Sequence, residues 1–154
     1  MKKTNNLVRH NALFLDRDGV INFDYGHVSC VARFDLIPNI EKVIGTAISL
    51  DYKIVVVTNQ AGIGKGFYTE DDFQILNKYM LEVFESKGCK IDAVYFCPFH
   101  PTEGKGFYLK DSFDRKPKPG MLLKAMQDLN LDMGKSILVG DNITDIRAGM
   151  SASV

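Results

Sequence analysis

Asp16 and Asp18 lie one residue apart, directly after the short apolar run at residues 12–15 and just before Gly19. A buried strand that ends in carboxylates delivers them to the C-terminal edge of a parallel sheet, where open α/β sheets bind ligands. Two carboxylates this close repel each other unless a cation neutralises them, and a hard divalent metal ion is the usual partner of oxygen ligands. An ordinary Asp-Gly turn after a strand is the alternative explanation of the same residues.

A second acidic loop follows a later apolar run, at residues 136–139. Asp141 comes directly after Gly140, and Asp145 lies four residues further along the chain. Helix capping accounts for Asn142 but gives Asp141 no structural purpose. Metal ligation gives Asp141 one, because carboxylate oxygens are good ligands for a hard divalent cation.

Polar and basic side chains stand at two further strand exits or helix starts. Thr58, Asn59 and Gln60 end the apolar run that begins at residue 53, and their hydroxyl and amide groups can donate to phosphate oxygens. A turn that uses Thr58 and Asn59 for local backbone bonds explains them about equally well. Arg115 and Lys116 precede a predicted helix, where a lysine can neutralise a transferring phosphoryl group. A basic surface loop is the alternative for this pair.

The glycine-rich stretch at residues 61–66 matches neither a Walker loop nor a dinucleotide fingerprint. No Ser or Thr follows Lys65, and the spacing of the glycines is wrong for both motifs. We therefore expect a tight loop beside the site and a solvated Lys65.

Short apolar segments alternate with segments of helical periodicity along the whole chain. The predicted strands cover residues 12–15, 53–58, 93–96 and 136–139, and the predicted helices cover 38–50, 70–87 and 119–129, with a fourth beginning near 143. This order predicts an α/β fold of three layers, a Rossmann-like parallel sheet with helices on both faces. Residues 152–154 resemble the beginning of another strand, so we expect that a C-terminal edge strand is missing. We expect one domain over residues 1–154.

The composition excludes several classes of protein. The chain has 154 residues, 45% of them hydrophobic and 25% charged, and its 19 basic and 19 acidic side chains cancel. No net charge favours nucleic acid or an anionic membrane, and neither a signal-peptide core nor a membrane span is expected. An odd number of cysteines (Cys30, Cys89 and Cys97) favours reduced thiols and a cytoplasmic location. We take a monomer as the expected state.

The motifs, in this order, resemble those of the haloacid dehalogenase (HAD) superfamily of phosphohydrolases: Asp16-Arg17-Asp18-Gly19, Thr58, Lys116, and Gly140-Asp141 with Asp145. A narrower resemblance, to the heptose-bisphosphate and histidinol-phosphate phosphatase branch, rests on residues 17–22, 24, 58–63, 66–69, 97–98, 100–101 and 115–121. The match covers nearly the whole chain. It implies a HAD-like fold without a large cap domain and activity on small phosphomonoesters.

The resemblance also implies a role for each site residue. Asp16 is the nucleophile that forms an aspartyl-phosphate, and Asp18 is first the general acid and then the general base. Mg²⁺ is held by Asp16, the main-chain carbonyl of Asp18 and Asp141, while Asp145 supports these groups without binding the metal ion. The implied phosphate-binding or substrate-binding residues are Thr58, Asn59, Arg115 and Lys116.

One part of the branch's pattern is absent here. The branch usually carries a structural zinc in the loop before the lysine motif, but only Cys97 remains of its ligands, and Phe99, Ser112 and Asp114 stand at the other positions. One thiolate cannot hold a structural zinc, so zinc is not expected. We expect aromatic packing to order the loop instead, among Phe99, Phe107, Tyr108 and Phe113.

The resemblance favours removal of the 7-phosphate of D-glycero-D-manno-heptose 1,7-bisphosphate. Histidinol phosphate or another small sugar phosphate is the alternative substrate, and a catalytically silent binding protein is the alternative class. Asp24, His27 and Arg33 are candidates to contact the sugar, although each is also an ordinary surface residue type.

Overall fold

The computed structural model describes residues 9–154, and the basic residues at positions 1–6 lie outside this range. A four-stranded parallel sheet forms the middle layer, with β1 at Asn11–Leu15, β2 at Tyr52–Asn59, β3 at Ala93–Cys97 and β4 at Ile137–Val139. The strand order is β3-β2-β1-β4. Because β2 and β3 lie on one side of β1 and β4 on the other, the order reverses between β1 and β4, which is where such sheets bind ligands.

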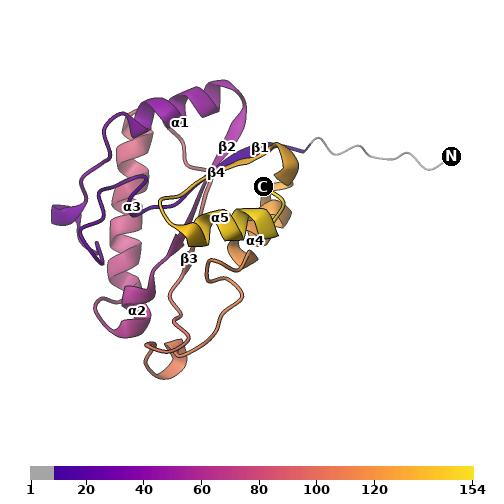
Figure 1. Ribbon diagram of the computed structural model, residues 1–154. Helices are drawn as coiled ribbons and strands as arrows, with labels where there is room; N and C mark the ends of the chain where they lie inside the picture. The colour runs from indigo at the N-terminus through magenta and orange to yellow at the C-terminus, as the bar shows by residue number, and fades with distance from the viewer. Residues whose placement is uncertain (1–8) are drawn as a thin grey trace.

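Helices cover both faces of the sheet (Figure 1), as the α/β pattern predicted. The helices of one face are α1 (Ile40–Ser49) and α3 (Glu70–Ser86), and those of the other are α4 (Gly120–Leu129) and α5 (Ile143–Ser151). A short helix, α2 (Ala61–Lys65), follows β2, and three single 3₁₀ turns lie at Val31–Arg33, Gly106–Tyr108 and Met133–Lys135.

The alternation of side chains along β1 divides the core in two. Leu13 and Leu15 pack with the cluster that α1 and α3 complete, whereas Ala12 and Phe14 pack with the cluster that α4 and α5 complete. A strand buried on both faces reads as a continuous apolar run rather than as an alternating one. This burial on both faces fixes where β1 ends and therefore where its aspartates emerge.

Side-chain caps set the starts of two helices, α3 and α5. Thr69 and Asp72 form the capping box at the start of α3 that the sequence predicted, with the Thr69 hydroxyl accepting from the Asp72 amide at 3.1 Å. Asn142 and Asp145 form a second capping box at the start of α5. The second box matters for the site, because it fixes the orientation of Asp145.

Two sequence-based expectations are corrected. Residues 152–154 do not begin a strand: Ser153 has a left-handed backbone (φ 64°), and the Val154 amide donates to the Gly149 carbonyl at 2.9 Å, which closes the end of α5. The glycine-rich stretch forms α2 rather than a loop, and Lys65 is not simply solvated because its ammonium pairs with Glu103.

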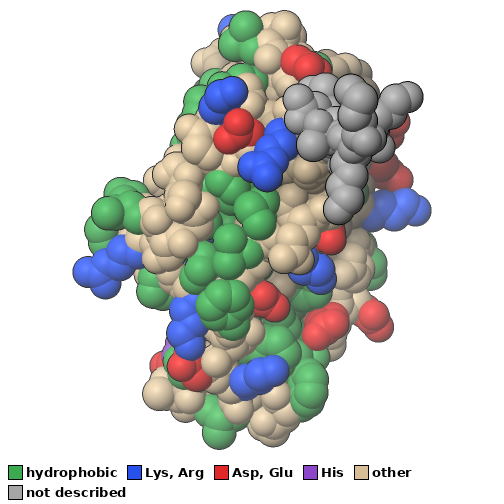
Figure 2. Space-filling model, turned by 90° about the vertical axis from the view of Figure 1, so that its right-hand side faces the viewer, with side chains coloured by type: hydrophobic (Ala, Val, Ile, Leu, Met, Phe, Trp, Pro, Cys, Tyr) green, Lys and Arg blue, Asp and Glu red, His purple; other side chains and the backbone are tan. Residues whose placement is uncertain are grey.

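The surface shows no segregation of charge on the face drawn in Figure 2, where side chains of both signs are interspersed. This distribution agrees with the equal counts of basic and acidic residues. Within residues 9–154, no helix has both the length and the apolar character that crossing a membrane requires.

Candidate active site

A polar pocket of about 480 Å³ lies at the C-terminal ends of the strands. It collects six of the predicted site residues, namely Asp16, Asp18, Asn59, Arg115, Lys116 and Asp141. Thr58 is buried at the end of β2 beside this pocket, and Asp145 is buried behind Lys116. Four segments that are far apart in the sequence therefore meet where the sheet topology places a ligand.

Lys116 is the centre of one set of contacts, which we call the Lys116 network (Asn59, Lys116, Asp16, Asp141 and Asp145). The Lys116 ammonium lies 2.5 Å from Asp145 Oδ1 and 3.1 Å from Asp16 Oδ1, and it donates to the Val57 carbonyl at 2.9 Å. Only 3% of Lys116 is exposed. A buried ammonium needs paired charge, and the two carboxylates supply it.

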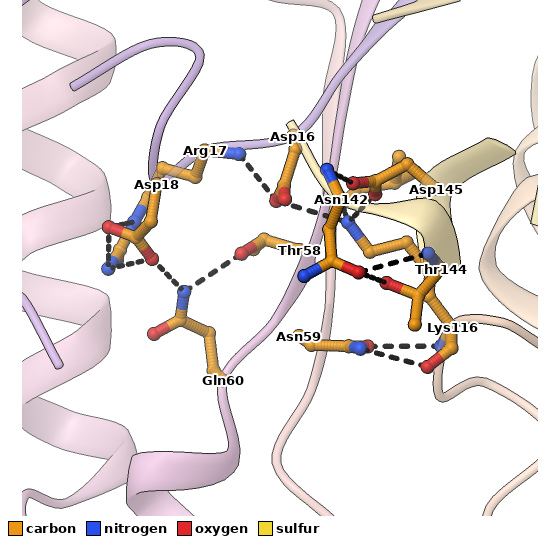
Figure 3. A network of polar contacts seen from close by, with 11 residues as sticks. Asp16, Arg17, Asp18, Thr58, Asn59, Gln60, Lys116, Asn142, Thr144 and Asp145 are labelled. Atoms are coloured by element: carbon orange, nitrogen blue, oxygen red, sulfur yellow. Dashed lines mark hydrogen bonds and ion pairs between the residues drawn. The ribbon is translucent and has the colours of Figure 1, made fainter. Parts of the chain in front are cut away.

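Asn59 holds the backbone of Lys116. Its Nδ2 donates to the Lys116 carbonyl at 3.0 Å, and its Oδ1 accepts from the Lys116 amide at 3.1 Å (Figure 3). The sequence assigned Asn59 to phosphate binding, and the structure gives this side chain a structural use as well. The two bonds fix the position of a loop residue that lies 57 positions further along the chain.

Three carboxylates gather beside the ammonium. Asp16, Asp141 and Asp145 each offer an oxygen within 4.8 Å of the others. Burial raises the pKa of Asp16 to about 6 in spite of the nearby Lys116, and burial also raises the pKa of Asp141. Gly19 makes this approach possible, since a Cβ at this position would lie 1.9 Å from Asp141 Oδ2.

The donor set of this cluster fits a hard divalent cation. Both oxygens of Asp145 are engaged, one by Lys116 and the other by the Asn142 amide at 3.1 Å. Asp16 and Asp141 are therefore the carboxylates left to bind a metal ion, with Asp145 supporting them. Three carboxylates against one ammonium leave an excess of negative charge that a cation would neutralise.

A second set of contacts surrounds Asp18, and we call it the Asp18 network (Arg17, Asp18, Asn22, Gln60 and Tyr68). Arg17 is only 2% exposed, and its NH2 group lies 2.9 Å from Asp18 Oδ2 and 3.0 Å from Oδ1. Asn22 Nδ2 donates to Oδ1 at 2.9 Å. Gln60 Nε2 donates to Oδ2 at 3.1 Å.

Gln60 connects this network to Thr58. Its Nε2 also donates to the Thr58 hydroxyl oxygen at 2.8 Å, and its Oε1 accepts from the Tyr68 hydroxyl. Arg17 and Tyr68 were not predicted as site residues, and Gln60 was predicted only as one of the strand-end amides that could donate to phosphate. Gln60 directly follows Thr58 and Asn59 at the strand end, and this position is the one signal that pointed to it.

Arg115 reaches the pocket from the loop that follows β3. Its NH1 group donates to the Phe99 carbonyl at 3.3 Å. The rings of Phe99, Phe107 and Tyr108 pack on one another with centroids 5.5–6.0 Å apart, as expected for this loop. Phe113, expected in the same cluster, is instead 59% exposed, and no ring contact within residues 9–154 joins it to the others.

The same loop also docks on α2. Lys65 pairs with Glu103, and the Lys105 amide donates to the Gly64 carbonyl at 2.8 Å. His100 is held within the loop, its Nδ1 accepting from the Glu103 amide at 3.0 Å. Cys97 is buried, and burial raises the pKa of its thiol. That zinc does not bind here stays a prediction.

The three candidates for sugar contact separate into two groups. Asp24 and His27 line the pocket, and the His27 ring lies 4.7 Å from the ring of Phe67. Arg33 is not among the lining residues and donates to the Tyr25 carbonyl at 2.6 Å. Asp24 and His27 therefore remain candidates by position.

Comparison with known proteins identifies close relatives. A family model described as HAD-hydrolase-like matches residues 113–153. The chain is 52% identical over 147 residues to the D-glycero-alpha-D-manno-heptose-1,7-bisphosphate 7-phosphatase of Burkholderia mallei, a match that covers 96% of this chain and 78% of that protein. It is 43% identical to the D-glycero-beta-D-manno-heptose-1,7-bisphosphate 7-phosphatase of Pasteurella multocida, over 93% of this chain and 77% of the relative.

A solved structure resembles the fold closely. It is the D,D-heptose 1,7-bisphosphate phosphatase from B. bronchiseptica, complexed with magnesium and phosphate, with a TM-score of 0.82 and 26% identity. The match covers 92% of this chain and 76% of that one.

Proposed function

Because this chain belongs to the D-glycero-manno-heptose-1,7-bisphosphate 7-phosphatase family of HAD-like hydrolases, we propose that it removes the 7-phosphate of D-glycero-D-manno-heptose 1,7-bisphosphate. The observation that carries the proposal is the meeting of Asp16, Lys116 and Asp141 at one pocket. The proposed active unit is one domain, residues 1–154, acting as a monomer on a small phosphorylated substrate. A monomer is proposed because this chain alone supplies the side chains named above.

Asp16 is the proposed nucleophile. One of its carboxylate oxygens attacks the phosphorus in line, the bond from phosphorus to the sugar oxygen breaks, and an aspartyl-phosphate forms. Asp16 Oδ1 is held by the Arg17 amide at 2.7 Å and by Lys116 at 3.1 Å. Within residues 9–154 no hydrogen bond or ion pair holds Oδ2, so Oδ2 is the oxygen available to attack.

The cofactor of this reaction is Mg²⁺, as in the magnesium complex of the related heptose bisphosphate phosphatase. Asp16 and Asp141, with the main-chain carbonyl of Asp18, would hold it, and Asp145 would support them. When bound, a divalent cation neutralises charge on the phosphoryl oxygens and orients the phosphate. Lys116 supplies a fixed positive charge on the same side, and Thr58 and Asn59 are the proposed hydrogen-bond donors to the phosphoryl group.

Asp18 is the proposed general acid and base. It gives a proton to the departing sugar oxygen and later takes one from the water that hydrolyses the aspartyl-phosphate. Asp18 is bound by groups other than Lys116, so its carboxyl group is separate from the ammonium that serves the phosphate. Arg115 lines the same pocket and is the proposed ligand of a second phosphate group, since a guanidinium suits planar oxyanions.

The substrate class is tested by phosphate release in the presence of Mg²⁺. The panel contains both anomers of the heptose bisphosphate, histidinol phosphate and 4-nitrophenyl phosphate. We expect the heptose bisphosphate to have the highest kcat/KM and heptose 1-phosphate to be the product. The α anomer is tested first, because the relative named for it has 52% identity, against 43% for a relative named for the β anomer.

Two outcomes of this assay contradict the proposal. Selective hydrolysis of histidinol phosphate would assign the chain to the other substrate of its branch. Failure to release phosphate from any ester, with Mg²⁺ binding intact, would make the chain a catalytically silent relative.

A further inference from the structure

The Asp18 carboxylate accepts more hydrogen bonds than the neutralisation of its charge by Arg17 requires. Arg17 contacts both oxygens, through Nε at 3.3 Å to Oδ1 and through NH2 to Oδ1 and Oδ2. Asn22 adds a third bond to Oδ1, whereas Oδ2 receives, from residues 9–154, the Arg17 NH2 group and Gln60 alone. Oδ2 is thus the less heavily bonded of the two oxygens, and it is the one that Gln60 contacts.

Gln60 has a single orientation that satisfies its neighbours. Both hydrogens of Nε2 are engaged, one by Asp18 Oδ2 and the other by the Thr58 hydroxyl oxygen at 2.8 Å (Figure 3). Rotating the amide by 180° would point its carbonyl at the Asp18 carboxylate, which repels it. One buried amide therefore orients the carboxyl of Asp18. Because it donates to the Thr58 hydroxyl oxygen, the Thr58 hydroxyl hydrogen can donate to another acceptor.

Tyr68 fixes that orientation from behind. Its hydroxyl donates to Gln60 Oε1. Burial raises the pKa of Tyr68 to about 12, so the hydroxyl keeps its proton at neutral pH. An amide that receives a bond on its oxygen and gives two from its nitrogen cannot turn without losing all three.

The glycine-rich helix α2 makes this arrangement possible. A Cβ on Gly62 would lie 2.2 Å from Cε1 of the Tyr68 ring, so only glycine lets the ring pack at this point. Gln60 directly precedes α2, and Tyr68 lies three residues after it ends. The glycine pattern that fits no phosphate-binding motif thus serves to bring Tyr68 against Gln60.

We propose that Gln60, held by Tyr68, is a positioning residue that directs the Asp18 carboxyl toward the leaving oxygen of the substrate. This proposal rests on the proposed function, because it assumes that Asp18 is the general acid. It predicts that Gln60 matters most when the leaving group needs a proton. The sugar alcohol of the heptose bisphosphate needs one, whereas 4-nitrophenolate leaves without protonation.

The test compares the two esters in Gln60→Met, whose side chain has nearly the same length but cannot hydrogen-bond in the same way. The quantity measured is kcat/KM, which includes the steps only as far as phosphoryl transfer to Asp16. We expect a fall of about 10-fold or more for the heptose bisphosphate and of less than about 3-fold for 4-nitrophenyl phosphate. Tyr68→Phe should also lower kcat/KM more for the heptose bisphosphate than for 4-nitrophenyl phosphate, but by a smaller factor.

The control for Tyr68→Phe is Tyr95→Phe. Tyr95 also donates from a hydroxyl to one side chain, Asp128 at 2.9 Å, but it packs against the hydrophobic cluster that α4 and α5 complete and does not line the polar pocket. We expect this variant to leave the ratio of the two esters unchanged. Thermal melting of each variant shows whether it is folded.

Three outcomes separate the inference from the function. If Gln60→Met and Tyr68→Phe lower kcat/KM equally for both esters, or for neither, Gln60 does not direct Asp18 and the inference is wrong. If Gln60→Met does not fold, the inference is judged from Tyr68→Phe alone, by comparing its kcat/KM values for the two esters. If the wild-type protein hydrolyses neither ester, the proposed function itself fails.

Discussion

The Lys116 network and the Asp18 network lie side by side at one pocket but differ in charge (Figure 3). In the Asp18 network one guanidinium faces one carboxylate, so the charges balance. In the Lys116 network two carboxylates pair with one ammonium, and a third, Asp141, offers an oxygen within 4.8 Å of both of them. This contrast in charge indicates that a cation is needed only on the Lys116 side.

The two networks also differ in how they are bonded. The Asp18 carboxylate accepts from Arg17, Asn22 and Gln60, which fixes its direction. Asp141 is exposed, and Gly19 gives it room to approach Asp16. A side chain that transfers a proton benefits from a fixed direction, whereas a metal ligand must accommodate an incoming ion. The following changes test this division.

The largest effect is expected from Asp16→Asn, which removes the nucleophile and keeps the shape of the side chain. We expect kcat to fall by at least ~10³-fold, because no other group can form the covalent intermediate. Steady-state phosphate release measures the loss, and circular dichroism checks the fold. Activity close to that of the wild type would contradict the assignment of Asp16.

Lys116→Met is expected to destabilise the protein strongly as well as to inactivate it. Removing one partner of a buried ion pair costs about 3–5 kcal/mol, and here it leaves Asp16 and Asp145 without their ammonium. Urea unfolding in the presence of a chelator measures the change in the free energy of unfolding. Added Mg²⁺ should restore stability more in this variant than in the wild type, because the cluster is more negative.

Lys118→Met is the matched control for that loss. Lys118 pairs with Asp111 at 2.6 Å, but both side chains reach solvent, with exposed fractions of 39% and 69%. A surface pair contributes about 0.5 kcal/mol. Equal destabilisation by the two substitutions would show that burial of the Lys116 network is not what makes it matter.

Asp141→Asn is expected to weaken Mg²⁺ binding and to leave the metal-free fold intact. A ligand present at 100 times its Kd stabilises the folded state by about 2.7 kcal/mol, so Mg²⁺ should raise the melting temperature of the wild type. The rise should be smaller in the variant at the same Mg²⁺ concentration. Melting curves with chelator and over a series of Mg²⁺ concentrations provide the comparison, and an undiminished rise would exclude Asp141 as a ligand.

The positions of the acidic residues were predictable because strands mark them. The apolar run before Asp16 is buried on both faces, and such a run shows where a strand ends. The run before Asp141 forms the strand β4 at the edge of the sheet, where Ile137 and Val139 are exposed, but its apolar, β-branched residues mark it as a strand as well. Parallel strands bring their C-terminal ends to one edge, so the carboxylates had to be neighbours. Lys116 was predictable on a different ground, because the Arg115-Lys116 pair lies just before a predicted helix.

Other features depend on loop placement, which local pattern does not contain. Asn59 bonds to the backbone of Lys116 only because the loop after β3 passes over the end of β2. Lys65 pairs with Glu103 because Gly64 lets that same loop approach α2: a Cβ there would lie 2.4 Å from the Pro98 carbonyl oxygen. The three residues 152–154 were too few to distinguish a strand from a helix end.

The smallest of these effects is expected from Asn59→Ala, which removes both bonds to the Lys116 backbone. Leaving that amide and carbonyl without their partner costs about 1–3 kcal/mol, and kcat/KM should fall by roughly 10-fold as Lys116 loses its fixed position. The informative measurement is the unfolding of the substrate-free protein. A side chain that only donates to phosphate contributes nothing before substrate binds, so unchanged stability with lowered kcat/KM would assign Asn59 to phosphate alone. A loss of both would place it in the Lys116 network, because the two backbone bonds exist whether or not substrate is present.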